Sequence, residues 1–263
     1  MTSIKILMDG IIESSSALLS EPYANDHENY GTARWSTDED LKKLTQIIIK
    51  ANEGGLTVHF HAMGDEAVSN AVDCVEKAYE EAGDVILESR NAMTHLALVH
   101  DEDYQRISDL NMIAVVNPWT SKDPANFVES EELMYLGEER MNQQYPVKSF
   151  LDANIVTSFG TDYGASFVYE PVNCYRVLVT RTTADMDPAH ILNDGQQLTP
   201  TEAIKVMTAN SAYQMFKEDT YGTLEVGKKA SLVVLSKNLL EIEDKDIAET
   251  EVERTMSNGT WVK

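Results

Sequence analysis

The chain has 263 residues, of which 43% are hydrophobic, and this is enough for one sizeable core. Its 44 Asp and Glu residues against 21 Lys and Arg residues give a formal net charge of −23. This charge argues against nucleic acid or an anionic membrane as a partner, because both would be repelled. No apolar run approaches transmembrane length, so the sequence predicts a soluble protein, and we expect a cytoplasmic location.

Strand and helix signals alternate along the first 160 residues. Short apolar runs predict strands at residues 4–8, 56–60, 91–96, 112–116 and 155–159. Helical spacing of apolar residues and acidic or capped helix starts predict helices at residues 37–52, 65–81, 101–110 and 147–153. Strands separated by helices are typical of parallel βαβ units, so the sequence predicts an α/β fold with five parallel strands.

The pattern changes after residue 162. Thr199 followed three residues later by Glu202 forms a capping box, which predicts a helix over residues 199–216. The tail has short apolar runs at residues 230–235 and 260–262, with an Asn-Gly turn before the second run, and these predict a small β element. We therefore expect two domains, residues 1–218 and 219–263.

Residues that can bind a metal ion lie at the ends of several predicted strands. In LTVHFHAMGD, residues 56–65, His59 and His61 point to the same side, because side chains alternate along a strand. An HxH pair is a weak signal by itself, since both histidines can also be hydrogen-bonded in a core. However, His95 ends the next strand and Asp162 follows the fifth, and residues at the carboxyl ends of parallel barrel strands converge. Two histidines and an aspartate form a ligand set suited to zinc or a similar ion.

Four other residues have both a functional and a purely structural interpretation. Lys5 lies within the first strand, where a buried ammonium is costly unless it is paired or modified; from the residues alone, a surface lysine on an edge strand is the simpler interpretation. Asp65 can support the site, but capping the helix that follows is its commoner role. Trp119 and Tyr163 follow strand ends, where they can line a pocket or simply pack.

Taken in order, these motifs resemble the metal-dependent amidohydrolase superfamily, in the branch that includes N-substituted formamide deformylase-like enzymes. The motifs are KILMDG at residues 5–10, HAMGD at 61–65, TH at 94–95, GTD at 160–162, LTPTEAIKVMTANSAYQMF at 198–216 and GTLEVGKKASLVVL at 222–235. The resemblance implies a (β/α)8 TIM-type barrel joined to a small β-sandwich. This chain would supply about strands 4 to 8 of the barrel and the carboxyl-terminal part of the sandwich.

The resemblance also implies roles for individual residues. Lys5, carboxylated in many members of the family, would bind one or two divalent ions together with His61 and His95, and zinc is the expected metal. Asp162 would be a further ligand that takes a proton from the attacking water and returns it to the leaving amine. The residues expected near the ligands or the substrate are His59, Asp65, Trp119 and Tyr163.

The function implied is hydrolysis of C–N bonds in small amide-type molecules, and a deaminase of the same superfamily is one alternative. The other alternative is a catalytically incomplete fragment or partner chain, because no HxH motif precedes Lys5 as it does in the family. We expect a small-molecule substrate, no nucleic acid or membrane partner, and a chain that can form a homo-oligomer.

Overall fold

The computed structural model describes residues 2–117, 129–166, 168–182, 187 and 191–263, which form two compact units. The first unit holds the described residues up to Asn117 and those from 129 to Thr157. The second unit holds the described residues from Ser158 onward.

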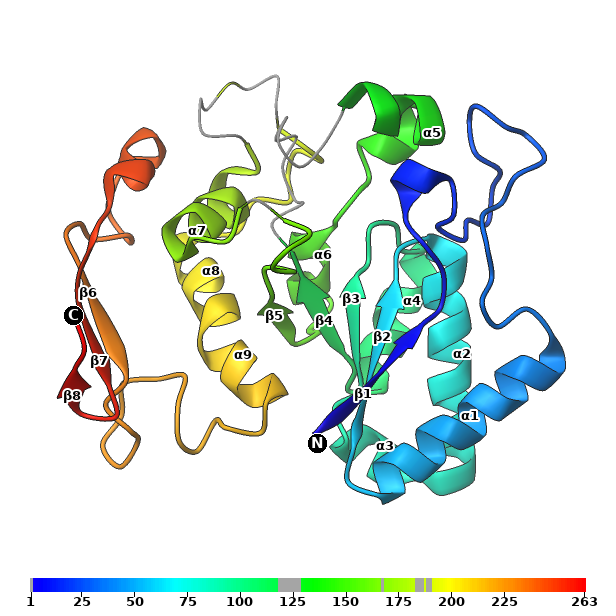
Figure 1. Cartoon of the computed structure of the whole chain (residues 1–263), viewed down its shortest axis with the longest axis horizontal. Helices are drawn as coiled ribbons and strands as arrows, with labels where there is room; N and C mark the ends of the chain where they lie inside the picture. Colours follow the sequence, from blue (N-terminus) through cyan, green and yellow to red (C-terminus); the bar gives the residue numbers. More distant parts are fainter. Residues whose placement is uncertain (1, 118–128, 167, 183–186, 188–190) are drawn as a thin grey trace. The chain divides into compact units, whose positions relative to one another are not determined.

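A five-stranded sheet organises the first unit. Its strands are β1 (Ser3–Leu7), β2 (Thr57–Ala62), β3 (Ala92–His95), β4 (Ile113–Val116) and β5 (Thr157–Phe159), arranged in chain order (Figure 1). The pairings from β1 to β4 are parallel. The boundary between the two units falls within β5, after its first residue. The predicted α/β class with five strands is therefore confirmed.

Helices connect the strands of the first unit. They are α1 (Asp38–Glu53), α2 (Asp65–Ala82), α3 (Asp84–Glu88), α4 (Asp101–Asp109), α5 (Glu129–Met141) and α6 (Val147–Asp152), with a short 3₁₀ helix, η1 (Ile12–Ser14). The predicted cap of α1 is confirmed, because Thr37 Oγ1 accepts a hydrogen bond from the Asp40 amide at 3.1 Å. The helix α3 was not predicted from the sequence. Among the described residues, every helix is too short or too polar to cross a membrane.

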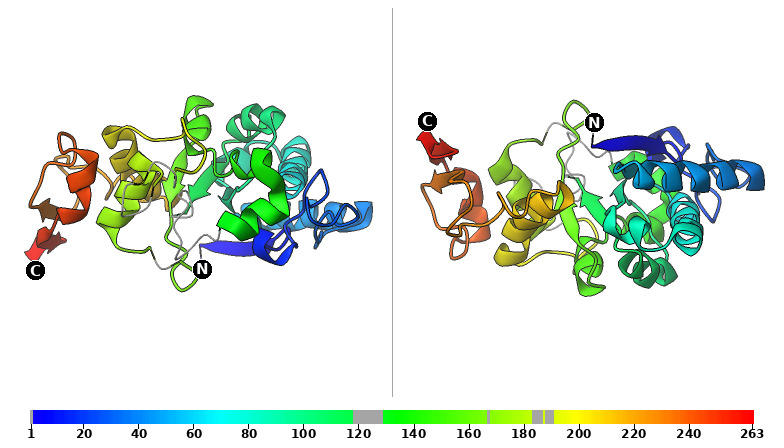
Figure 2. Two further views of the ribbon diagram at one scale, coloured as in Figure 1. Left: turned by 90° about the horizontal axis from the view of Figure 1, so that it is seen from above. Right: turned by 90° about the horizontal axis from the view of Figure 1, so that it is seen from below.

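The two faces of β1 and β2 differ in burial. Ile6, Val58 and Phe60 are buried, and Figure 2 shows α1 and α2 together on one side of β1. The alternate residues Lys5 and Leu7 are exposed, and the residues paired with them on β2, His59 and His61, are half-buried. The face that carries the lysine and both histidines is therefore the more open one. By contrast, β3 and β4 are buried throughout.

The second unit contains helices and a separate antiparallel sheet. Its helices are α7 (Pro171–Thr180), α8 (Pro200–Met207), α9 (Ala209–Gln214) and the 3₁₀ helix η3 (Asp244–Glu249); its sheet has the order β6 (Leu232–Leu235), β7 (Val252–Ser257), β8 (Thr260–Trp261). The predicted turn joins β7 to β8, with left-handed φ angles of 48° at Asn258 and 83° at Gly259. The predicted domain boundary at residue 218 stays a prediction.

The helix expected over residues 199–216 is wrong in one respect, because it is broken at Thr208. Its start is as predicted, since Thr199 and Glu202 form a capping box. At Thr208 the backbone leaves the helical region (φ −125°, ψ −81°). The Thr208 hydroxyl donates to the Ile204 carbonyl at 2.6 Å, which is the acceptor that the helix would offer to the Thr208 amide. Two helices, α8 and α9, result.

A buried asparagine pair aligns the starts of β2 and β3. Asn91 Oδ1 accepts from the Val58 amide at 2.9 Å and from Asn52 Nδ2 at 3.0 Å, and Asn91 Nδ2 donates to Asn52 Oδ1 at 2.9 Å. We expect Asn91→Ala to lower the free energy of unfolding by about 3 kcal/mol in urea denaturation, because it leaves buried partners without hydrogen bonds. The matched change Asn142→Ala removes an exposed hydrogen bond to Glu138 and should cost within about 0.5 kcal/mol. Equal losses in the two variants would contradict this prediction.

Candidate functional site

Polar side chains lie at or just after the carboxyl ends of four neighbouring strands. We call Asp9, His61, His95 and Asn117 the strand-end cluster. Asp9 Oδ1 lies 3.6 Å from His61 Nε2, and the rings of His61 and His95 have their centroids 4.5 Å apart at an interplanar angle of 68°. The Asn117 side chain forms a hydrogen bond with His95. The structure therefore brings His61 and His95, which are 34 positions apart in the sequence, into direct contact.

His95 reaches His61 through an unusual backbone conformation. In the β2–β3 register, His95 pairs with Ala62 rather than with His61. An extended residue at that position would share the side of Ala62, which is the side opposite to His61. The φ of His95 is 80°, and Leu96 follows with 51°, so the alternation of the strand is interrupted. Few non-glycine residues adopt this region, so the surrounding structure must hold His95 in it.

One ring nitrogen of His61 has a fixed role. His61 Nε2 lies 2.8 Å from the Gly10 carbonyl oxygen, which can only accept, so Nε2 carries the proton and donates. In the neutral form of the ring, the Nδ1 lone pair is then available to a metal ion. A ring that donates one N–H to a backbone carbonyl and presents its other nitrogen is the usual arrangement of a metal-binding histidine.

Burial favours the neutral form of two histidine rings, those of His59 and His95. Burial, with the charge of Lys5 as the second cause, lowers the pKa of His59 to about 4. Burial is also the main cause that lowers the pKa of His95 to about 3, and the charges of His61 and Lys5 add to it. Both imidazoles are therefore neutral at pH 7, which is the form that binds metals. The Nε2 atom of His59 is buried with no hydrogen-bond partner among the described residues.

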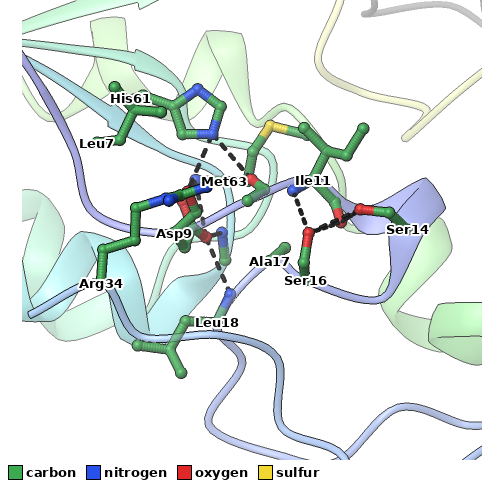
Figure 3. A network of polar contacts seen from close by, with 12 residues as sticks. Leu7, Asp9, Ile11, Ser14, Ser16, Ala17, Leu18, Arg34, His61 and Met63 are labelled. Atoms are coloured by element: carbon green, nitrogen blue, oxygen red, sulfur yellow. Dashed lines mark hydrogen bonds and ion pairs between the residues drawn. The ribbon is translucent and has the colours of Figure 1, made fainter. Parts of the chain in front are cut away.

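Asp9 is a member of the cluster that the sequence analysis did not identify. It is fully buried, and its carboxylate accepts hydrogen bonds from the backbone amides of Leu18, Met63 and Gly64 (Figure 3). Burial raises the pKa of Asp9, while the three backbone hydrogen bonds act in the opposite direction. The sequence signal that could have identified Asp9 was its position. Asp9 comes shortly after the first strand, just as Asn117 follows the fourth.

Lys5 and Asp65 are two predicted site residues that are not members of the strand-end cluster. Lys5 lies opposite His59 in the β1–β2 register, on the exposed face. Asp65 is the first residue of α2 and not its cap, which is Gly64. Asp65 nevertheless bonds within this helix start, because its Oδ1 accepts from the Glu66 amide at 2.9 Å. The carboxylate also accepts from the amide of Ser20 at 2.9 Å and from its hydroxyl at 2.8 Å. Its Oδ2 atom lies 3.7 Å from His100 Nε2.

The remaining predicted residues lie elsewhere in the chain. Asp162 and Tyr163 belong to the second unit and lie in the loop that follows β5, where Tyr163 is exposed and Asp162 is open to solvent as well. The φ of Asp162 is 51°, and its carbonyl accepts from the Ser166 amide at 3.1 Å. The Tyr163 ring contacts the Tyr169 ring edge-on, with centroids 5.4 Å apart. Trp119 lies outside the described residues.

A cavity of about 620 Å³ lies in the first unit, between the loop after β1, the start of α2, the segment after β3 and α5. Its apolar lining includes Leu98 and Leu136, which are buried. Its polar lining includes Asp65 and His100, which follow His61 and His95 by four and five residues. A volume of this size suits a small molecule.

Two of the predicted metal ligands fit a metal site. His61 and His95 are adjacent and His95 is neutral, and the hydrogen bond to Gly10 leaves His61 Nδ1 available. Within the part of the chain that the structure describes, no group of three or more His, Cys, Asp or Glu side chains is arranged to hold a metal ion. A catalytic zinc takes three protein ligands, and His61 and His95 are two residues of a type that binds it.

Comparison with known proteins finds amidohydrolases and related enzymes as the relatives of this chain. The model of the amidohydrolase family matches residues 1–263. The chain is 27% identical over 263 residues to the putative amidohydrolase YtcJ of Bacillus subtilis, covering 99% of this chain and 46% of that protein. It is 26% identical over 219 residues to the N-substituted formamide deformylase of Arthrobacter pascens, covering 82% of this chain and 38% of that protein.

A solved structure also matches most of this chain over less than half of its own length. The structure of an uncharacterised metal-dependent hydrolase from Pyrococcus horikoshii matches with a TM-score of 0.75 at 26% identity, covering 93% of this chain and 46% of that one. The chain therefore spans less than half the length of these relatives.

Proposed function

Because this chain belongs to the amidohydrolase family, we propose that it carries the carboxyl-terminal part of a metal-dependent hydrolase that cleaves a C–N bond of a small amide-type molecule. The observation that carries this proposal is the contact between His61 and the neutral His95 at the ends of neighbouring parallel strands. The strand order β1 to β5 supports assigning these strands to positions 4 to 8 of a (β/α)8 barrel. The antiparallel strands β6 to β8 would then belong to a small β-sandwich.

His61 and His95 bind a divalent cation in this proposal, zinc being the expected ion. Lys5, in carboxylated form, and Asp162 complete the ligand set; support for Lys5 comes from its place on the same face as His59 and His61. The bound cation supplies Lewis-acid polarisation of the scissile carbonyl and lowers the pKa of the attacking water.

The other residues of the chain bind the substrate and move the proton. The carboxylate of Asp162, in the open loop after β5, accepts a proton from the attacking water and returns it to the leaving amine. In this proposal the substrate binds in the cavity that Asp65 and His100 line, with the buried Leu98 and Leu136 against its apolar part. Asp65 and His100 bind its polar groups.

A second candidate is a chain that needs another polypeptide segment to complete its site. Two observations favour it: the described residues bring together two histidine ligands rather than three, and the chain spans 46% and 38% of its two curated relatives. In this case the chain binds a metal weakly and gains activity only when an amino-terminal barrel segment with an HxH motif is added.

Cobalt binding tests the proposed ligands directly. We expect Co²⁺ to bind near one equivalent per chain, followed by its visible absorption, and His61→Ala and His95→Ala each to weaken binding at least 10-fold, about 1.4 kcal/mol. His27→Ala removes an exposed histidine outside the cluster and should leave the affinity unchanged. Unchanged affinity in both cluster variants would overturn the assignment of these ligands.

Product analysis then separates the candidate reactions. The cobalt- or zinc-loaded chain is assayed with N-substituted formamides and with an amidine, alone and with the separately produced amino-terminal half of a relative. Formate release supports the amide hydrolase, and ammonia release from the amidine supports the deaminase. Activity that requires the added segment supports the second candidate, and Asp162→Asn should abolish any activity found.

A further inference from the structure

Asp9 has more contacts with the His61 region than a strand-terminating residue needs. Its carboxylate is 0% exposed and lies at the centre of Figure 3. Oδ2 accepts from the Leu18 and Gly64 amides, each at 2.9 Å, and Oδ1 accepts from the Met63 amide at 3.1 Å. Two of these three donors are the second and third residues after His61. The carboxylate thus ties the turn after His61 to the loop after β1.

The same segment also holds the His61 ring. His61 Nε2 donates to the carbonyl of Gly10, the residue after Asp9, and lies 3.6 Å from Asp9 Oδ1. Both atoms that face Nε2 are acceptor oxygens, which favours the tautomer with the proton on Nε2. Met8, the residue before Asp9, donates its amide to the His61 carbonyl at 2.9 Å. Residues 8, 9 and 10 therefore fix the backbone, the tautomer and the ring orientation of His61.

We propose that Asp9 is a positioning residue for His61, which holds the ring with its proton on Nε2 and its Nδ1 lone pair presented to a ligand. Figure 3 shows the second ring nitrogen of His61 turned away from the network around Asp9. The part of this proposal that concerns metal binding rests on the proposed function, whereas the tautomer does not.

An amide at position 9 cannot replace the carboxylate. Asp9 accepts on both oxygens, and an asparagine side chain has one acceptor oxygen and one NH₂ donor. In Asp9→Asn the NH₂ group would face at least one backbone N–H, and the acceptor pair that faces His61 Nε2 and the three amides would be broken. Asp103→Asn is the matched control. Asp103 lies on helix α4, is also 0% exposed, and accepts hydrogen bonds from Ser69 and Arg106.

The test uses imidazole ¹⁵N chemical shifts, which report which ring nitrogen is protonated without any metal. We expect wild-type His61 to show the Nε2–H tautomer, Asp9→Asn to show a mixture of tautomers, and Asp103→Asn to match the wild type. A wild-type His61 that is protonated on Nδ1 would overturn the proposal even if Asp9→Asn does not fold. An unchanged tautomer in folded Asp9→Asn would also overturn it.

Cobalt binding is the second measurement. We expect Asp9→Asn to weaken Co²⁺ binding about 10- to 100-fold and Asp103→Asn to leave it unchanged. If the wild-type chain binds no Co²⁺, the proposed function fails while the tautomer still tests the role of Asp9. If the wild type binds Co²⁺ and Asp9→Asn binds it equally well with an unchanged tautomer, the role of Asp9 fails and the proposed function stands.

Discussion

Replacing Gly64 with alanine is expected to destabilise the first unit by about 4 kcal/mol or more, measured by urea denaturation. A Cβ at this position would lie 1.9 Å from the Leu18 carbonyl oxygen and 2.5 Å from its carbonyl carbon. Both are backbone atoms, so neither can move away as the end of a flexible side chain can. The two segments lie this close because Oδ2 of Asp9 accepts hydrogen bonds from both the Leu18 and the Gly64 amides.

The control for this prediction is Gly55→Ala. Gly55 has a left-handed φ of 74°, and a Cβ added there would have no heavy atom of another segment within 4 Å among the described residues. Alanine there should cost about 1 kcal/mol, from backbone conformation alone. The φ of Gly64 is −81°, which alanine adopts freely, so the difference between the two variants measures the close approach. A Gly64→Ala variant as stable as Gly55→Ala would contradict the prediction.

The fold was predictable where the signal is local. The strands from β1 to β5 and the helices α1, α2, α4 and α6 follow from apolar runs, helical spacing and caps, all read within a few residues. The helix α3 was missed because it has five residues and begins directly after Gly83. The break at Thr208 depends on one side-chain hydrogen bond, which helical spacing does not reveal.

The site was predictable where chemistry and strand position coincide. His61 and His95 end strands and are metal-binding residue types, so the sequence predicted that they converge. The roles of Asp9 and Asn117 were not predictable, because they depend on partners far away in the sequence. Asp9 is bonded to amides nine, 54 and 55 residues away. The left-handed backbone of His95, which turns its ring toward His61, is likewise set by the fold and not by local sequence.

The metal-free chain is expected to lose stability between pH 7 and pH 5. The pKa values of His59 and His95, about 4 and about 3, are below the ordinary 6.5, so the unfolded state takes up protons first as the pH falls. Their contribution to stability is complete above about pH 6.5 and is lost progressively toward pH 4 and 3. At pH 5 each histidine should lower the free energy of unfolding by about 2 kcal/mol.

Asp9 acts in the opposite direction, and single substitutions separate these effects. Burial raises the pKa of Asp9, so the folded state takes up this proton before the unfolded state does, which offsets part of the loss. We therefore expect His59→Gln to lose about 2 kcal/mol less than the wild type between pH 7 and pH 5, measured by urea denaturation at each pH. His27→Gln, at an exposed position, should keep the wild-type dependence. A wild-type pH dependence in His59→Gln would contradict this prediction, because it would show that His59 binds its proton equally well in the folded and the unfolded state.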